Sequence, residues 1–251
     1  MKATTMWCGL AVVGLAAGMA AADPTTINGV VVQTRVFNDF GNSTLNVTNN
    51  FPASVQIQEG PFGVPTSPTP FANKHRARLS NDGGATPYAF QNQNGWDLRV
   101  DFRLAADAGG NPKEGALELL VPLVNNDDPQ NPVNYVDEGR FLVKSNGEVA
   151  IFGGTMPFHS FGFVYTPGDT VELRMIYTPG DGAINSGTQA TIQYGFNGQL
   201  SPVYVWGDNR ADGFTDGTNV AYVLQNSPIG GQGMNQTVVG EWSNFRIVPA
   251  P

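Results

Sequence analysis

Residues 96–104 read Trp-Asp-Leu-Arg-Val-Asp-Phe-Arg-Leu, and this stretch decides the fold class. Its apolar residues alternate strictly with charged ones. Because an extended chain turns successive side chains to opposite faces of a sheet, the pattern predicts a β-strand with one buried face and one charged face. Such half-buried strands are typical of antiparallel sheets.

The same alternation recurs at residues 171–177 and 190–197. Strand-like runs also occupy residues 29–37 and 238–248, near the two ends of the chain. We find no apolar helical period longer than two turns, and glycine, asparagine, threonine and proline are abundant. The sequence therefore predicts an all-β fold built from two packed sheets.

Two local features refine this prediction. The turn at residues 145–147, Ser-Asn-Gly, separates strand-like runs at 141–144 and 148–152. Asparagine followed by glycine accepts the positive φ angles of a tight hairpin, so we expect a hairpin here. Residues 117–124 predict an apolar strand, which we expect Pro122 to break because proline lacks a backbone N–H.

Residues 1–22 have the features of a secretory signal peptide. Lys2 precedes a short apolar run, and Ala20-Ala-Ala22 supplies small residues for cleavage. We expect cleavage after Ala22, which leaves residues 23–251 as a single secreted or extracellular domain that could associate with the cell surface. The apolar run is too short to span a bilayer, so we expect no membrane span in the mature chain. The single cysteine, Cys8, lies in the leader, and no disulfide is expected.

The charge of the chain excludes one class of partner. Its formal net charge is −8 at pH 7, and its lysines and arginines are scattered along the sequence. Nucleic acid binding requires a concentrated basic surface, so we do not expect nucleic acid as a partner.

Four stretches resemble the concanavalin A-like lectin/glucanase superfamily, which also contains laminin-G-like modules. They are residues 79–84, 88–98, 165–175 and 241–249. The resemblance covers nearly all of the mature chain and implies a two-sheet antiparallel jelly-roll sandwich. The last residues, Val248-Pro-Ala-Pro251, also resemble the start of a PEP-CTERM-type sorting tail.

The resemblance implies two kinds of catalytic site, and the sequence matches neither. Glycanases of this superfamily carry carboxylates on alternate residues of one strand, whereas Glu114 and Glu118 are four residues apart. We interpret them as a solvated turn glutamate and a rim glutamate. Residues 74–78, Lys-His-Arg-Ala-Arg, are similar to the basic strand of alginate lyases, but the rest of that pattern is missing. We therefore expect His75 at the surface, His159 packed, and no catalytic residue.

The charged residues of the 96–104 strand have two interpretations. They are expected to pair across strands with Glu172 and Arg174. The alternative is a surface that faces a ligand.

One segment collects side chains suited to sugar binding. An aromatic ring covers the apolar face of a sugar while carboxylates and amides bind its hydroxyl groups. The predicted ligand-binding residues are Tyr204, Trp206, Asp208 and Asn209. The alternative is that Tyr204 or Trp206 belongs to the core, as large aromatic side chains often do, while the rest of the segment is a long turn.

The same segment predicts a calcium site. Calcium takes six to eight oxygen ligands, which aspartates and asparagines around a glycine turn can supply. The predicted metal ligands are Asp208, Asp212, Asp216 and Asn219. A glycine-rich polar turn without an ion explains the same residues.

These observations predict a non-catalytic recognition module that binds carbohydrate weakly, with a polysaccharide or surface glycan as its partner. A structural component of an extracellular matrix or surface layer is the alternative. A divergent polysaccharide-active enzyme is the third hypothesis.

Overall fold

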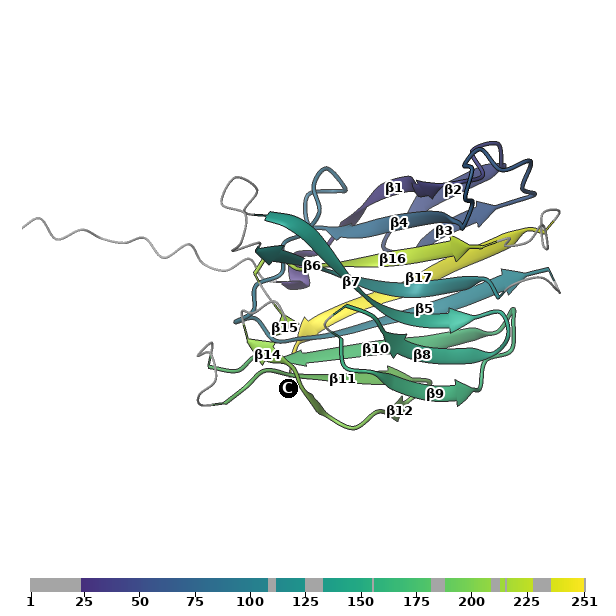
Figure 1. Cartoon of the computed structure of the whole chain (residues 1–251). Helices are drawn as coiled ribbons and strands as arrows, with labels where there is room; N and C mark the ends of the chain where they lie inside the picture. The colour runs from purple at the N-terminus through teal and green to yellow at the C-terminus, as the bar shows by residue number, and fades with distance from the viewer. Residues whose placement is uncertain are drawn as a thin grey trace, which may run out of the picture.

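A computed structural model describes residues 24–107, 112–124, 133–154, 156–181, 188–208, 213–214, 216–227 and 236–250. For residues 123–124, 133–138, 207–208 and 213–214 it describes the backbone alone. The described residues form two stacked antiparallel sheets, with one short 3-10 helix, η1 (Pro24–Thr26), and no α-helix (Figure 1). The all-β prediction is confirmed.

One layer is a seven-stranded sheet. In spatial order its strands are β1 (Gly29–Asn38), β4 (Asn73–Ser80), β16 (Asn219–Asn226), β6 (Glu114–Val124), β7 (Val133–Lys144), β8 (Glu148–Phe152) and β9 (His159–Phe163).

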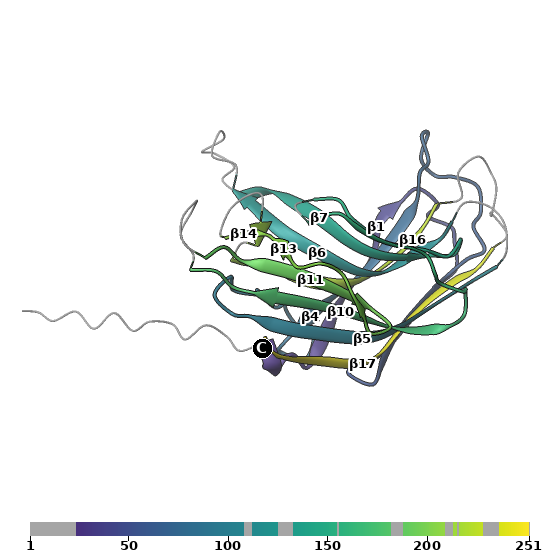
Figure 2. The ribbon, with the colours of Figure 1, turned by 90° about the horizontal axis from the view of Figure 1, so that it is seen from below.

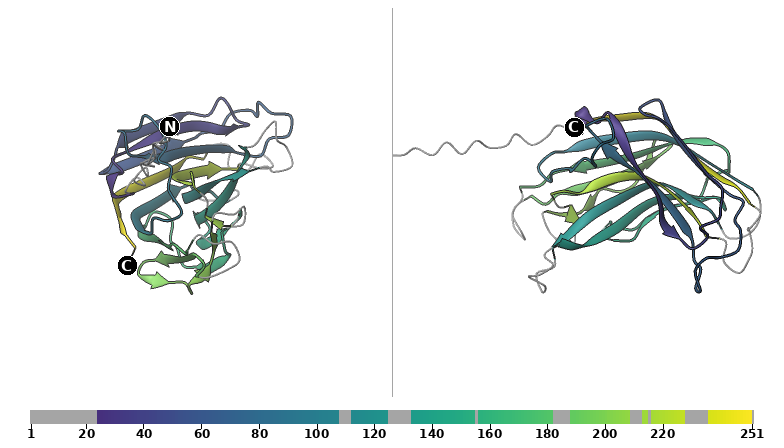
Figure 3. Two further views of the ribbon diagram at one scale, coloured as in Figure 1. Left: turned by 90° about the vertical axis from the view of Figure 1, so that its left-hand side faces the viewer. Right: turned by 90° about the horizontal axis from the view of Figure 1, so that it is seen from above.

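The other layer is an eight-stranded sheet, which lies against the first (Figure 2). Its strands run in the order β12 (Gln199–Leu200), β11 (Thr191–Phe196), β10 (Thr170–Thr178), β5 (Trp96–Ala106), β17 (Val238–Pro249), β3 (Ser54–Glu59) and β2 (Leu45–Asn50). Strand β13 (Tyr204–Val205) also pairs with β11, and β14 (Gly207–Asp208) pairs with β15 (Gly213–Phe214) as a separate parallel ribbon. The further views of Figure 3 show the same two layers.

The local predictions hold with one exception. Strands β5, β10 and β11 occupy the predicted stretches, and β7 and β8 form the predicted hairpin with Gly147 at a φ of 96°. The prediction that Pro122 breaks its strand is wrong, because β6 continues to Val124 and keeps its register with β7 through Pro122 to Leu123, with a shift only at Val124. Strand β16 accompanies β6 only as far as Leu120, so Pro122 has a paired strand on one side, where prolines in sheets are tolerated.

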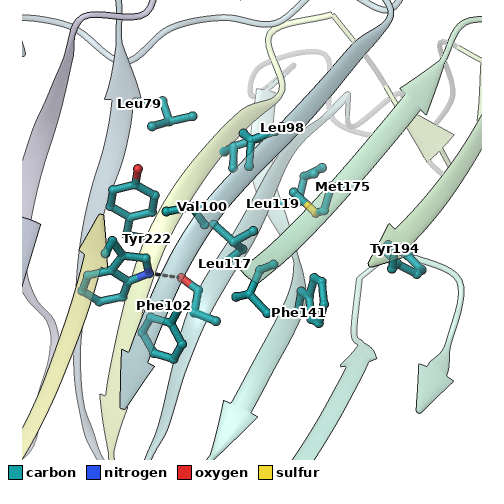
Figure 4. Packing of buried hydrophobic residues seen from close by; sticks show 14 of the residues in the cluster. Leu79, Leu98, Val100, Phe102, Leu117, Leu119, Phe141, Met175, Tyr194 and Tyr222 are labelled. Carbon is teal, nitrogen blue, oxygen red and sulfur yellow. Dashed lines mark hydrogen bonds between the residues drawn. The ribbon is translucent and has the colours of Figure 1, made fainter. Parts of the chain in front are cut away.

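The core lies between the sheets, and aromatic rings join them (Figure 4). The Trp242 ring of β17 stacks on Tyr222 of β16, with centroids 5.2 Å apart and an interplanar angle of 7°. Its indole N–H donates to the Ala116 carbonyl oxygen of β6 at 2.8 Å. Because the ring is buried and its only polar group is paired, Trp242 fastens the two sheets without leaving an unsatisfied donor.

Candidate functional site

The two aromatic residues of the predicted sugar site differ in burial. Trp206 is 1% exposed, and its ring packs edge to face on Tyr177 with centroids 6.0 Å apart. Tyr204 is half-buried, and its hydroxyl lies 2.9 Å from Nδ1 of His159. Trp206 therefore has no face free for a sugar, which corrects the prediction at this residue in favour of the core alternative. The packed position expected for His159 is confirmed.

The predicted calcium loop is only partly within the described residues. Asn209 and Asp212 lie outside them, and Asp208 is described by its backbone in β14. Asp216 is exposed, and its Oδ1 accepts the backbone N–H of Asn92 at 2.8 Å. Within the part of the chain that the structure describes, no group of three or more metal-binding side chains occurs.

Asn219 has other roles in the fold. It is 1% exposed, and its amide nitrogen donates to the carbonyl oxygens of Leu79 and Tyr88 at 3.2 and 2.7 Å. Its amide oxygen accepts the Nε–H of Arg78 at 3.1 Å. These bonds explain Asn219 without an ion, and calcium at the remaining residues stays a prediction.

A cluster of buried and half-buried charges lies elsewhere, on the face of the seven-stranded sheet turned away from the core. In β4, Ala77 and Leu79 point into the core, so Lys74, Arg76 and Arg78 point outward. The register places Arg78 and Arg140 in one row with Glu118 of β6, at the same height across four adjacent strands. We call these five residues the basic cluster: Lys74, Arg76, Arg78, Glu118 and Arg140.

Glu118 is the centre of the basic cluster. It is 0% exposed, and its carboxylate contacts the Lys74 ammonium, the Arg76 guanidinium and, at 3.5 Å, Nε of Arg140. The interpretation of Glu118 as a rim glutamate is therefore wrong. Strand β6 lies in the interior of the sheet, and cations from its neighbours converge on this one carboxylate.

Arg78 differs from the other cations of the cluster. Its guanidinium is half-buried, and Nε donates to the Asn219 amide oxygen. No carboxylate among the described side chains pairs with it. Burial, and then the positive charge of Arg76, lower the pKa of Arg78 from its ordinary value. A cation that is half-buried and lies beside another cation interacts favourably with an anion.

His75 does not belong to this face. It is 0% exposed and points between the sheets, with Nε2 3.0 Å from Oε2 of the buried Glu59. Its Nδ1 accepts the backbone N–H of Arg35 at 3.0 Å. The expected surface position of His75 is wrong, because its position in β4 alternates with the outward-facing basic residues.

The outer face of the eight-stranded sheet carries the predicted charge ladder. Both oxygens of Asp97 accept hydrogen bonds from Arg174, at 2.7 and 2.6 Å, and Arg99 also pairs with Asp97. Glu172 pairs instead with Arg246 of β17 at 2.7 Å. Cross-strand pairing is confirmed for Arg174, while Glu172 finds a partner that the sequence pattern did not indicate.

Replacing Asp97 by asparagine is expected to destabilise the protein by about 1.5–3 kcal/mol at pH 7. Burial alone would raise the pKa of Asp97, but the hydrogen bonds and charges of Arg174 and Arg99 outweigh it and hold the pKa below its ordinary value. Such a carboxylate stabilises the fold above its unfolded-state pKa and loses this contribution as the pH falls through its folded-state pKa. Urea unfolding of both proteins across acidic and neutral pH checks this: their difference should shrink in acid, and a difference independent of pH would contradict it.

Comparisons with known proteins identify structures with a similar fold. No protein-family model matches the sequence, and no curated protein matches it. A family 7 alginate lyase, A1-II′, solved with substrate, is similar in structure with a TM-score of 0.54 and 8% identity, over 90% of this chain and 94% of that one.

Two sugar-binding proteins are also similar. A seed lectin of Lotus tetragonolobus has a TM-score of 0.46 and 13% identity over 92% of this chain and 96% of the lectin. The carbohydrate recognition domain of Emp46p has a TM-score of 0.47 and 11% identity over 84% and 90% of the two chains. At such identities the likeness is one of fold alone. The chain has a two-sheet antiparallel jelly-roll fold of the concanavalin A type, which it shares with the alginate lyase structure.

Proposed function

We propose that the protein is a recognition module that binds an acidic polysaccharide at the basic cluster and does not cleave it. The observation that carries this proposal is Arg78, a half-buried guanidinium beside Arg76 with no carboxylate partner among the described side chains. Proteins that share this fold include one named for alginate and one named as a carbohydrate recognition domain, which supports carbohydrate as the class of ligand.

The chemistry of Arg78 suits a sugar that carries a carboxylate. A guanidinium presents parallel N–H donors that match the two oxygens of a carboxylate. Because Asn219 already accepts the Nε–H, the two terminal nitrogens are the donors that would face a ligand. A half-buried charge is screened less by salt than an exposed one, so one such contact contributes measurably to affinity.

The chemistry of the cluster supports binding rather than cleavage. General acid–base catalysis requires a group that exchanges a proton near neutral pH. Glu118 is fully buried, and its carboxylate is occupied by contacts with three cations. On the described outer positions of β4, β16 and β6 there is no histidine, tyrosine or cysteine, and His75 faces the opposite way.

Affinity electrophoresis in gels containing a polyuronate tests the proposal. The protein should be retarded by the polyuronate and not by the same polymer after reduction of its carboxyl groups, and retardation should weaken with added salt. The recovered polymer should show no new reducing or unsaturated ends. Equal migration in both gels would refute acidic-polysaccharide binding, and new chain ends would refute the non-catalytic assignment.

No helix among the described residues is long and apolar enough to cross a membrane.

A further inference from the structure

One side of the sandwich exposes an unusual amount of apolar surface. We call it the apolar edge, and its six residues are Phe158, Phe163, Val164, Leu200, Val203 and Val205, each between 43% and 73% exposed. Single exposed apolar residues are common, but a cluster of six marks an interaction surface.

These residues are neighbours in space although two separate segments supply them. Strand β9 is the last strand of the seven-stranded sheet, and β12 and β13 lie at the end of the eight-stranded sheet, on the same side of the molecule (Figure 1). His159 of β9 contacts Tyr204 of β13, and Phe161 of β9 lies 5.8 Å from the Phe196 ring of β11. The apolar edge therefore runs along both sheets.

The apolar edge carries no formal charge. Residues 156–168 and 198–207 contain no lysine, arginine, aspartate or glutamate. Burial lowers the pKa of His159, the titratable imidazole of this edge, so the ring is neutral at pH 7. This absence stands out in a chain with a formal net charge of −8.

Strand β9 also offers backbone groups for pairing. It pairs with β8 alone in the described sheet, so one of its sides has no strand partner. Exposed strand edges are usually protected by charges, prolines or bulges. The β1 edge has Arg35 in a bulge, and the β2 edge exposes polar asparagines and threonine. Strand β9 also has a bulge, at Phe161, but it reads His-Ser-Phe-Gly-Phe and contains no lysine, arginine, carboxylate or proline.

We infer that the apolar edge is the contact between two copies of this chain, paired through β9 about a twofold axis. Antiparallel pairing of a strand edge with itself satisfies its open backbone groups, and a twofold contact brings the same surface from each copy together. Two copies of this chain carry the same negative net charge and repel each other at most other surfaces. At the apolar edge they can meet without like charges facing each other.

Sedimentation velocity of the purified protein over a wide concentration range tests this inference. Wild type should sediment as a dimer. Phe163→Asp and Val205→Asp each place a charge in the contact and should raise the dimer dissociation constant about a hundredfold or more. Val64→Asp is the matched control, since Val64 is 75% exposed in a loop far along the sheets from β9, and it should leave the dimer intact.

A cross-linking experiment does not depend on destabilising variants. In a Cys8→Ser background, Ser160→Cys places one thiol near the centre of β9, and mild oxidation should give a disulfide-linked dimer, whereas Val64→Cys should give none. A wild type that stays monomeric at every concentration would overturn the inference. So would a dimer that survives both aspartate variants, or equal cross-linking at positions 160 and 64.

Discussion

Replacing Glu118 by alanine is expected to lower the free energy of unfolding by about 3–5 kcal/mol. The substitution removes a carboxylate that is fully buried and contacts three cations, two of which, Lys74 and Arg76, are themselves buried. Taking one partner out of a buried ion pair leaves positive charge in a poorly solvated place, which is far more costly than loss of an exposed pair.

Urea unfolding monitored by tryptophan fluorescence measures this effect. Glu118→Gln keeps the shape of the side chain and should recover only part of the loss, because the charge is what the cations require. Glu172→Ala is the control, since Glu172 pairs with Arg246 on the other sheet, where both side chains are partly exposed, and should cost about 0–1 kcal/mol. Equal effects at Glu118 and Glu172 would contradict a central role for Glu118.

Replacing Glu59 by alanine is expected to cost a similar amount, about 3–5 kcal/mol. Glu59 is 0% exposed and accepts hydrogen bonds from Ser43 and Asn73, each at 2.7 Å, besides its contact with His75. Without this carboxylate, buried donors between the sheets lose their acceptor.

Gln58→Ala is the matched control for Glu59. Gln58 is the preceding residue of β3, and strand alternation turns its partly exposed side chain to the opposite face. It should change stability by less than about 0.5 kcal/mol. Thermal melts of both variants give the comparison, and a Glu59→Ala protein as stable as Gln58→Ala would show that the buried acceptor is dispensable.

The sequence pattern predicted the fold because alternation is a local signal. Each residue of the 96–104 strand needs only its two neighbours to reveal which face it occupies. The same rule applies to β4, where Lys74, Arg76 and Arg78 alternate with His75 and Ala77. It places His75 on the same face as Ala77 and therefore in the interior, against the surface position expected from its basic neighbours.

The basic cluster could not be predicted in the same way. Glu118 is 42 residues from Arg76 and 22 from Arg140, and only the register of β4, β16, β6 and β7 brings them together. Alternation places Tyr204 and Trp206, which are two residues apart, on the same face of an extended chain. It could not say which of them is buried, because that depends on the packing of Trp206 against Tyr177.

The central claim is that Arg78 binds the carboxylate of an acidic polysaccharide, and titration calorimetry with a polyuronate tests it most directly. Arg78→Ala should weaken binding about 10- to 100-fold, the loss of one charge-assisted hydrogen-bonded contact. It should lower the unfolding free energy by only about 1–3 kcal/mol, because the buried Asn219 amide oxygen loses its donor while no described carboxylate depends on this cation. Arg99→Ala, on the opposite sheet, is the matched control for net charge and should bind as wild type does. Equal affinity of Arg78→Ala and Arg99→Ala for the polyuronate would contradict the assignment of this site.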